Sequence, residues 1–175
     1  MKILNYYGQA LLIEATSKNS VLDNVIFEYG DMFMVYIIPM VSVHGTDVKI
    51  SNAVFRKADD IALSLIDSNS LIENTLFEDN RMTALSIQGG QTEIKDCQFK
   101  NNYIGADISN YSKIIFKNNF FTNNQIPLFM DSTNEIDLKE DNQILNNSVN
   151  KILFYSEPFP KEIIIPSPDF DDWPY

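Results

Sequence analysis

The 175-residue chain contains one cysteine, Cys97, and one histidine, His44. A single cysteine excludes an intramolecular disulfide and a metal site built from several cysteines, and a single histidine excludes a multi-histidine metal site within one chain. Basic residues are also scarce, because 13 Lys and Arg stand against 24 Asp and Glu, for a net charge of −11. Nucleic acids and anionic membrane surfaces attract basic proteins, so neither is expected as a partner. No apolar run approaches the roughly 20 residues of a membrane-spanning helix.

The rest of the composition is that of one folded domain. Hydrophobic residues make up 45% and charged residues 21% of the chain. These fractions are ordinary for a soluble globular protein and differ from those of disordered chains. A chain of this length forms about one domain with a sizeable core.

A segment of eight residues recurs along the chain around an aromatic anchor, and its copies lie 28, 22, 22, 22 and 24 residues apart. Between the anchors, large apolar residues alternate with small ones, as in Ile61, Leu63 and Leu65. A period of two predicts strands, and a strand that meets its equivalent one repeat later must pair in parallel. The sequence therefore predicts an all-β fold, a parallel β-helix of about six to seven coils of about 22 residues. The anchors are Phe27, Phe55, Phe77, Phe99, Phe121 and Leu145.

A second column of the repeat carries asparagine or aspartate three residues before each anchor. Stacked coils would place these side chains about 4.8 Å apart, where amides can form a ladder, and asparagine tolerates the left-handed backbone of a sharp corner. We expect Asn74 and Asn118 to be buried corner residues, and Phe77 and Phe99 to be buried neighbours in one stack. Cys97 is expected to be a small buried side chain, because nothing near it in sequence would lower its pKa. The column consists of Asn24, Asn52, Asn74, Asp96, Asn118 and Asn142.

The coils read roughly hydrophobic-x-Asn-x-x-Phe-x-x-Asn, followed by a short apolar strand. This pattern resembles the right-handed parallel β-helix repeat proteins of the pectin-lyase-like superfamily, including the NosD-like proteins, over about residues 10–155. The resemblance implies a right-handed solenoid and an extracellular, cell-surface or periplasmic location. It implies no single chemistry, because the superfamily includes lyases, hydrolases, epimerases, phage tail spikes and non-catalytic surface proteins.

The repeat sets the expected boundaries of the domain. We expect a β-helix over residues 1–157 and a Pro-rich tail over 158–175 that acts as a cap or a linker. Met1–Ala10 has the character of a coil and not of a signal peptide. The first interval is longer because of the apolar segment Asp31–Met40, which either folds back over an enlarged coil or forms an exposed patch for a partner or for self-association.

The sheet that follows each anchor is the first place to search for a ligand site. If Ile61, Leu63 and Leu65 point inward, small and nearly uncharged residues face outward. Such a flat face suits a neutral polysaccharide, with Phe129 as a stacking platform. One expected outward file is Ala62, Ala84, Gly105 and Pro127, and the other, which supplies the ligand-binding candidates, is Ser64, Ser86, Asp107 and Phe129.

An enzyme would need more titratable groups than this face offers. A glycosidase uses two carboxylates about 5–10 Å apart. The pair Asp59–Asp60 resembles the paired-aspartate element of pectin-type hydrolases, although the companion motifs of that family are missing. Arg56 and Arg81 are expected to pair with Asp59, Asp60 or Asp79 on neighbouring coils. His44 lies alone at a turn. If the chain is an enzyme, its catalytic candidates are Asp59, Asp60, Asp79, Arg81 and Asp107.

Three functions therefore remain open at this point. The favoured one is a non-catalytic β-helix module of a secreted or surface protein, structural, adhesive or carbohydrate-binding. The alternative is a polysaccharide-active lyase or glycoside hydrolase, and a trimeric spike would need the Asp31–Met40 segment as its contact surface. Polysaccharides or other cell-surface components are the expected partners, and no cofactor is expected beyond weak Ca²⁺ binding at acidic turns.

Overall fold

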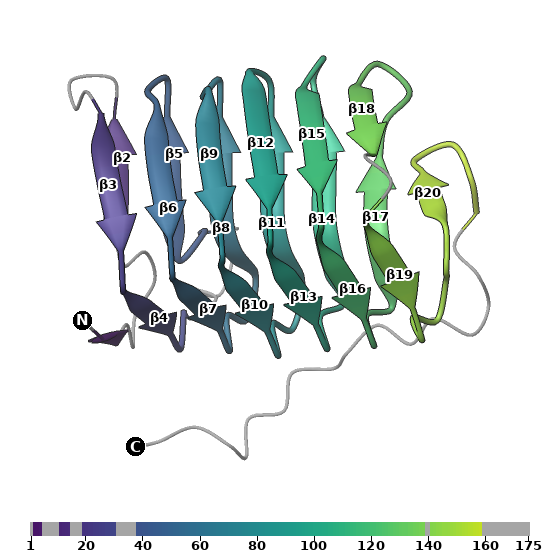
Figure 1. The fold of residues 1–175 in the computed structure, drawn as a ribbon, viewed down its shortest axis with the longest axis horizontal. Helices are drawn as coiled ribbons and strands as arrows, with labels where there is room; N and C mark the ends of the chain where they lie inside the picture. The colour runs from purple at the N-terminus through teal and green to yellow at the C-terminus, as the bar shows by residue number, and fades with distance from the viewer. Residues whose placement is uncertain (1, 5–10, 15–18, 31–37, 139–140, 159–175) are drawn as a thin grey trace.

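The computed structural model shows a solenoid of three parallel β-sheets that run along one axis (Figure 1). It describes residues 2–4, 11–14, 19–30, 38–138 and 141–158. Within these ranges every regular element is a β-strand, which confirms the predicted all-β fold. The same ranges contain no helix that is long and apolar enough to cross a membrane.

Each complete coil contributes one strand to each sheet, and each strand pairs in parallel with its equivalent in the next coil. Sheet A holds β1 (Lys2–Leu4), β4 (Ile26–Glu28), β7 (Val54–Arg56), β10 (Leu76–Glu78), β13 (Gln98–Lys100), β16 (Phe120–Thr122) and β19 (Gln143–Leu145). Sheet B holds β2 (Leu11–Glu14), β5 (Val41–His44), β8 (Ile61–Ile66), β11 (Thr83–Gln88), β14 (Ile104–Ser109), β17 (Ile126–Met130) and β20 (Ile152–Phe154). Sheet C holds β3 (Ser20–Asp23), β6 (Val48–Ser51), β9 (Ser70–Glu73), β12 (Gln91–Lys95), β15 (Lys113–Lys117) and β18 (Glu135–Leu138).

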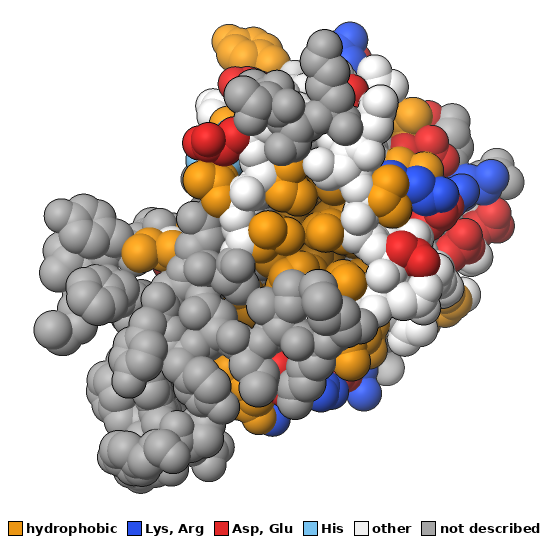
Figure 2. Space-filling view, turned by 90° about the vertical axis from the view of Figure 1, so that its left-hand side faces the viewer, with side chains coloured by type: hydrophobic (Ala, Val, Ile, Leu, Met, Phe, Trp, Pro, Cys, Tyr) orange, Lys and Arg blue, Asp and Glu red, His pale blue; other side chains and the backbone are white. Residues whose placement is uncertain are grey.

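The core is centred on the phenylalanine stack of sheet A. The rings of Phe77 and Phe99 are fully buried, 4.8 Å apart and nearly parallel, which confirms the prediction for this pair. Neighbouring pairs in the stack have centroid distances of 4.5 to 5.1 Å. Figure 2, which looks onto the end where β1–β3 lie, shows hydrophobic side chains in the middle and charged side chains toward the rim.

The anchor predicted for the last repeat is wrong by one residue. Phe121 pairs with Ile144, and Leu145 is 51% exposed on the outer face of sheet A. The loop before β19 is one residue longer than in the preceding coils, so Asn142 lies beside Asn119 and not beside Asn118. A slip of one residue along a strand exchanges its inner and outer faces, so the shift moves Ile144 into the core position.

The corner between sheets C and A is formed by the predicted asparagine column. Asn74 and Asn118 have φ values of 50° and 54°, and the Asn118 amide donates to Asp96 2.6 Å away. Both side chains are nevertheless exposed, so the prediction that they are buried is wrong. At the apex of a sharp corner the left-handed residue points its side chain outward, and the next residue turns inward. The inward positions belong to Thr75, Cys97 and Asn119.

A buried asparagine ladder lies instead at the corner between sheets A and B. Each amide nitrogen donates to a backbone carbonyl of the phenylalanine stack, and the first three also donate to the side-chain oxygen of the asparagine in the next coil. The Asn102 amide, for example, donates to Asn124 at 2.9 Å and to the Phe77 carbonyl at 3.1 Å. These amides therefore satisfy main-chain groups that the corner would otherwise leave unpaired inside the protein. The ladder consists of Asn80, Asn102, Asn124 and Asn147, all less than 8% exposed.

One predicted outward file of sheet B faces the core. Ala62 and Ala84 pack in the main hydrophobic core, and a side chain on Gly105 would approach the Phe121 ring to 3.2 Å. Ile104 and Ile126 belong to a separate cluster, against which Phe129 packs. At the start of a sheet B strand two successive residues face inward, as Ala62 and Leu63 do in β8. Inward and outward side chains alternate only after that point.

Two predicted segments lie largely outside the described residues. Of Asp31–Met40, only residues 38–40 are described, and Met40 is buried in the core. Of the tail 158–175, only Pro158 is described. The boundary at residue 157 and the self-association through Asp31–Met40 therefore stay predictions.

Candidate functional site

The predicted ligand-binding file lies on the outer face of sheet B. Ser64 and Ser86 are only 2% and 4% exposed, so Asp107 and Phe129 are its accessible members. The Tyr155 hydroxyl donates a hydrogen bond to the Asp107 carboxylate, and the Tyr155 ring lies 4.4 Å from that of Phe129. Tyr155 comes from the chain just after β20, and the sequence analysis missed it. The binding role of this file stays a prediction.

The surroundings of Asp107 raise the pKa of its carboxyl. Burial raises the pKa of the Asp107 carboxyl, while the hydrogen bond from Tyr155 lowers it and nearby Asp131 raises it again. Burial, followed by the hydrogen bond to Asp107, raises the pKa of Tyr155. The arrangement ties the last coil to β14, which lies two coils away.

The structure brings together three of the five catalytic candidates. The Arg81 guanidinium lies 3.6 Å from the Asp59 carboxylate, and Asp60 follows directly in the chain. Asp60 is 9% exposed, and burial, followed by the charge of Asp59, raises the pKa of its carboxyl. Asp79 is an exposed corner residue that accepts a hydrogen bond from Asn101, and Asp107 projects from sheet B.

The remaining titratable groups have structural surroundings. Arg56 pairs with Glu28 at 2.7 Å and Glu78 at 3.5 Å, so its partners are on neighbouring coils but are not the predicted aspartates. Cys97 is buried, and burial raises the pKa of its thiol to about 12, which leaves it protonated and unreactive at neutral pH. His44 ends β5 beside Ile66. Across the described part of the chain, no three His, Cys, Asp or Glu side chains gather in a group that could hold a metal ion.

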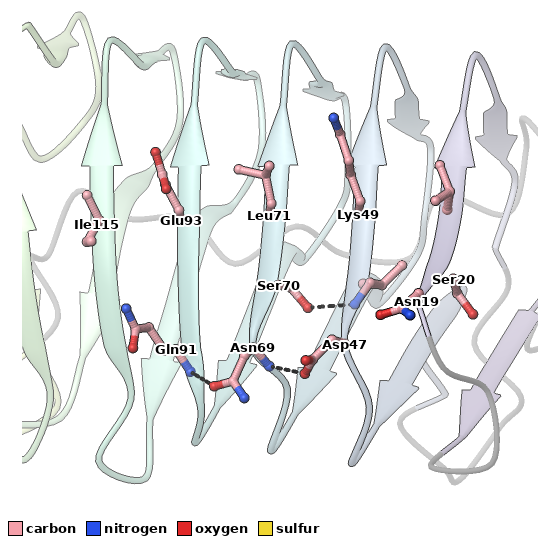
Figure 3. A pocket seen from close by; sticks show the side chains of 12 residues that line it. Asn19, Ser20, Asp47, Lys49, Asn69, Ser70, Leu71, Gln91, Glu93 and Ile115 are labelled. Carbon is pink, nitrogen blue, oxygen red and sulfur yellow. Dashed lines mark hydrogen bonds between the residues drawn. The ribbon is translucent and has the colours of Figure 1, made fainter.

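A shallow depression of about 420 Å³ crosses the outer face of sheet C (Figure 3). The repeat pattern of the sequence did not predict this depression. Two rows of side chains form its floor, each contributed by successive coils. We call the first the corner row, and it consists of Asn19, Asp47, Asn69 and Gln91. We call the second the central row, and within the depression it consists of Val21, Lys49, Leu71, Glu93 and Ile115.

The corner row carries amide groups with unused hydrogen-bonding capacity. The backbone N–H of Asn69 donates to the Asp47 carboxylate at 3.0 Å, and the N–H of Gln91 donates to the Asn69 side-chain oxygen at 3.1 Å. These bonds hold the side chains in place at the edge of the sheet. Among the described residues, no hydrogen bond engages the Asn69 amide nitrogen or the Gln91 amide group.

Three lysines of sheet C lie beside acidic partners. Glu73 lies within salt-bridge distance of both Lys49 and Lys95, and these hydrogen bonds lower the pKa of Glu73 and raise that of Lys95. Lys113 pairs with Glu135 at 3.2 Å. The face therefore offers a ligand amides, the Glu93 carboxylate and the aliphatic side chains of Leu71 and Ile115, without a surplus of positive charge.

Comparison with known proteins supports the architecture alone. A family model described as the right handed beta helix region matches residues 39–166, which is more than half of the chain. No curated protein matches the chain, and no solved structure matches it. The matched range includes the complete coils that carry the phenylalanine stack from Phe55 to Phe121 and the asparagine ladder. The chain therefore belongs to the family of right-handed parallel β-helix proteins.

Proposed function

We propose that this chain is a non-catalytic module of a surface or secreted protein and binds a neutral polysaccharide on the outer face of sheet C. The observation that carries the proposal is the depression of about 420 Å³, which spans several adjacent coils. Its volume is in the range of small-molecule sites, roughly 300–1,000 Å³. Amides at the corner row suit sugar hydroxyls, and aliphatic side chains suit the C–H faces of sugar rings.

The charges on this face favour a neutral ligand. The chain carries a net charge of −11, and Lys49 is already paired with Glu73. A polyanion approaching the depression would meet the carboxylates of Asp47 and Glu93. Like charges repel at this range, so a polyuronate would bind less well than a neutral chain.

Catalysis in the depression is disfavoured by its carboxylates. Asp47 and Glu93 are two coils apart, about 9.6 Å along the axis, and also differ in position along the strand. Glycosidases hold their two carboxylates on either side of one glycosidic bond, whereas Asp47 and Glu93 lie on coils that are not adjacent. Asp47 is also held by the hydrogen bond from Asn69.

A second candidate function is a polysaccharide-active lyase or hydrolase with its site at Asp59, Asp60 and Arg81. One observation favours it: burial raises the pKa of Asp60, as expected for a catalytic acid, beside the ionised pair of Asp59 and Arg81. Buried structural carboxylates show the same shift, so this site ranks second.

The test combines binding with product analysis. The purified protein is run in affinity electrophoresis gels containing neutral or anionic polysaccharides, and the same polymers are assayed for reducing ends and unsaturated products. We expect retardation in at least one neutral polysaccharide, no product, and weaker retardation for Leu71→Ala. Leu76→Ala is the matched control, because Leu76 is a partly exposed leucine of the same coil on sheet A. Retardation by none of the neutral polymers would refute the proposal, and turnover abolished by Asp60→Asn would establish the enzyme.

A further inference from the structure

The central row of sheet C alternates between apolar and charged side chains from coil to coil. The strand register places one residue of this row in each coil, always at the same position of the strand. Leu71 and Ile115 flank Glu93, and Val21 and Leu71 flank Lys49 in the same way. Aliphatic side chains therefore recur every second coil. The full row is Val21, Lys49, Leu71, Glu93, Ile115 and Asp137.

This alternation gives the face a repeat of two coils along the solenoid axis. The phenylalanine rings of the central coils lie 4.8 and 4.5 Å apart, in line with the usual strand spacing. Leu71 and Ile115 are therefore about 9.6 Å apart. A ligand that contacts both must present similar apolar surfaces at that interval.

An extended peptide does not fit this repeat. Its side chains return to the same face after two residues, about 6.4–6.8 Å, which is out of step with two coils. A peptide also gains most of its affinity by adding to the edge of a sheet. Strands β9 and β12 are paired on both sides, so no backbone groups are free for such an addition.

We propose that the ligand is an extended β-1,4-linked neutral glycan that lies along the solenoid axis over sheet C; this rests on the proposed function. In such a chain each sugar ring is turned by half a revolution relative to the last, so the same ring face returns at every second ring. Two extended rings span a distance close to two coils. Glycans with α-1,4 or β-1,3 linkages adopt helical shapes, so their ring faces do not return at an interval of two solenoid coils.

The geometry assigns a role to each side chain under the glycan. Leu71 and Ile115 pack against alternate rings. The Glu93 carboxylate, which lies between them, accepts a hydrogen bond from a hydroxyl of the intervening ring. The free amide groups of Asn69 and Gln91, in the adjacent corner row, bond to hydroxyls along one edge of the chain. All five residues lie on strands, or directly before them, that adjacent coils hold in register.

The test is calorimetric titration with oligosaccharides of two to six rings and of β-1,4, β-1,3 or α-1,4 linkage. We expect affinity for the β-1,4 series to rise in steps of two rings, each step following contact with one more aliphatic side chain. Leu71→Ala and Ile115→Ala should each weaken the six-ring ligand by roughly fivefold to tenfold, as expected for loss of one partly buried aliphatic group. Leu76→Ala should leave the affinity unchanged, and circular dichroism checks that all variants are folded.

The outcomes separate this inference from the function on which it rests. Equal affinity for the three linkages, or an even rise with every added ring, would overturn the two-coil match while leaving a glycan-binding module. Binding of no oligosaccharide or polymer would refute both. Binding of extended peptides, displaced by none of the glycans, would likewise refute both and identify sheet C as a protein-binding face.

Discussion

The buried asparagine ladder should be worth several kcal/mol at each position, and Asn102 gives the sharpest test. Replacing Asn102 with alanine removes four hydrogen bonds: two donated by its amide, to Phe77 and Asn124, and two accepted from Asn80. At about 1 kcal/mol of net stabilisation per bond, the loss is about 4 kcal/mol. That is a large part of the roughly 5–15 kcal/mol by which domains are usually stable.

The neighbouring residue is the natural control. Asn101 is exposed, has a φ of 57° and makes one side-chain bond, to Asp79. Asn101→Gly keeps the backbone conformation accessible and removes only that exposed bond, so it should cost about 1 kcal/mol or less. Urea unfolding followed by circular dichroism measures both variants. A loss for Asn102→Ala no greater than that for Asn101→Gly would refute the view that the ladder supports the corner.

Three further predictions concern the core and its titratable groups. Phe99→Ala should lower the free energy of unfolding by about 3–5 kcal/mol in urea, because it leaves a cavity between two stacked rings; a loss below about 1 kcal/mol would contradict this. Burial raises the pKa of Asp60, so its contribution to stability is present below the usual aspartate range and is lost as pH rises through the raised pKa. Asp60→Asn should therefore gain stability relative to the native protein as the pH rises above about 4, the usual aspartate pKa. If the stabilities of the two proteins changed in parallel with pH, this prediction would be wrong. Cys97 should react with a thiol reagent only after unfolding, since its pKa is about 12 in the folded chain; rapid labelling of the native protein would disprove this.

The phenylalanine stack could be predicted from the sequence because residues that are one repeat apart lie next to each other in adjacent coils. Phe77 and Phe99 are 22 residues apart, and one coil of that length returns the chain to the same place in the next layer. An interval does not give the direction of a side chain, however. Asn74 and Asn80 belong to equally regular columns, yet one lies outside and the other inside, because the corner residue has a left-handed backbone.

Departures from regularity explain the other differences. One extra residue before β19 moved the anchor from Leu145 to Ile144, and a local change at the start of β8 turned Ala62 inward. Asn69 and Gln91 are 22 residues apart, which is one repeat, but the hydrogen bonds that leave their amide groups free are defined only by the folded chain. The sequence therefore contains the regular spacing of the residues of the candidate site on sheet C. It does not show that they form a depression with free amide groups.

The asparagine ladder also has a polarity. Each amide donates toward the C-terminal side, from Asn80 through Asn102 and Asn124 to Asn147, so the amide dipoles point the same way and polarise one another. Asn147 donates in turn to Asn150 of its own coil, which occupies the acceptor place of a further asparagine. Asn150 therefore ends the series of hydrogen bonds, much as a capping residue satisfies the end of a helix. Duplication of a whole 22-residue coil between Phe55 and Phe121 would lengthen the series without breaking it, whereas extension beyond Asn147 would first require the loss of Asn150.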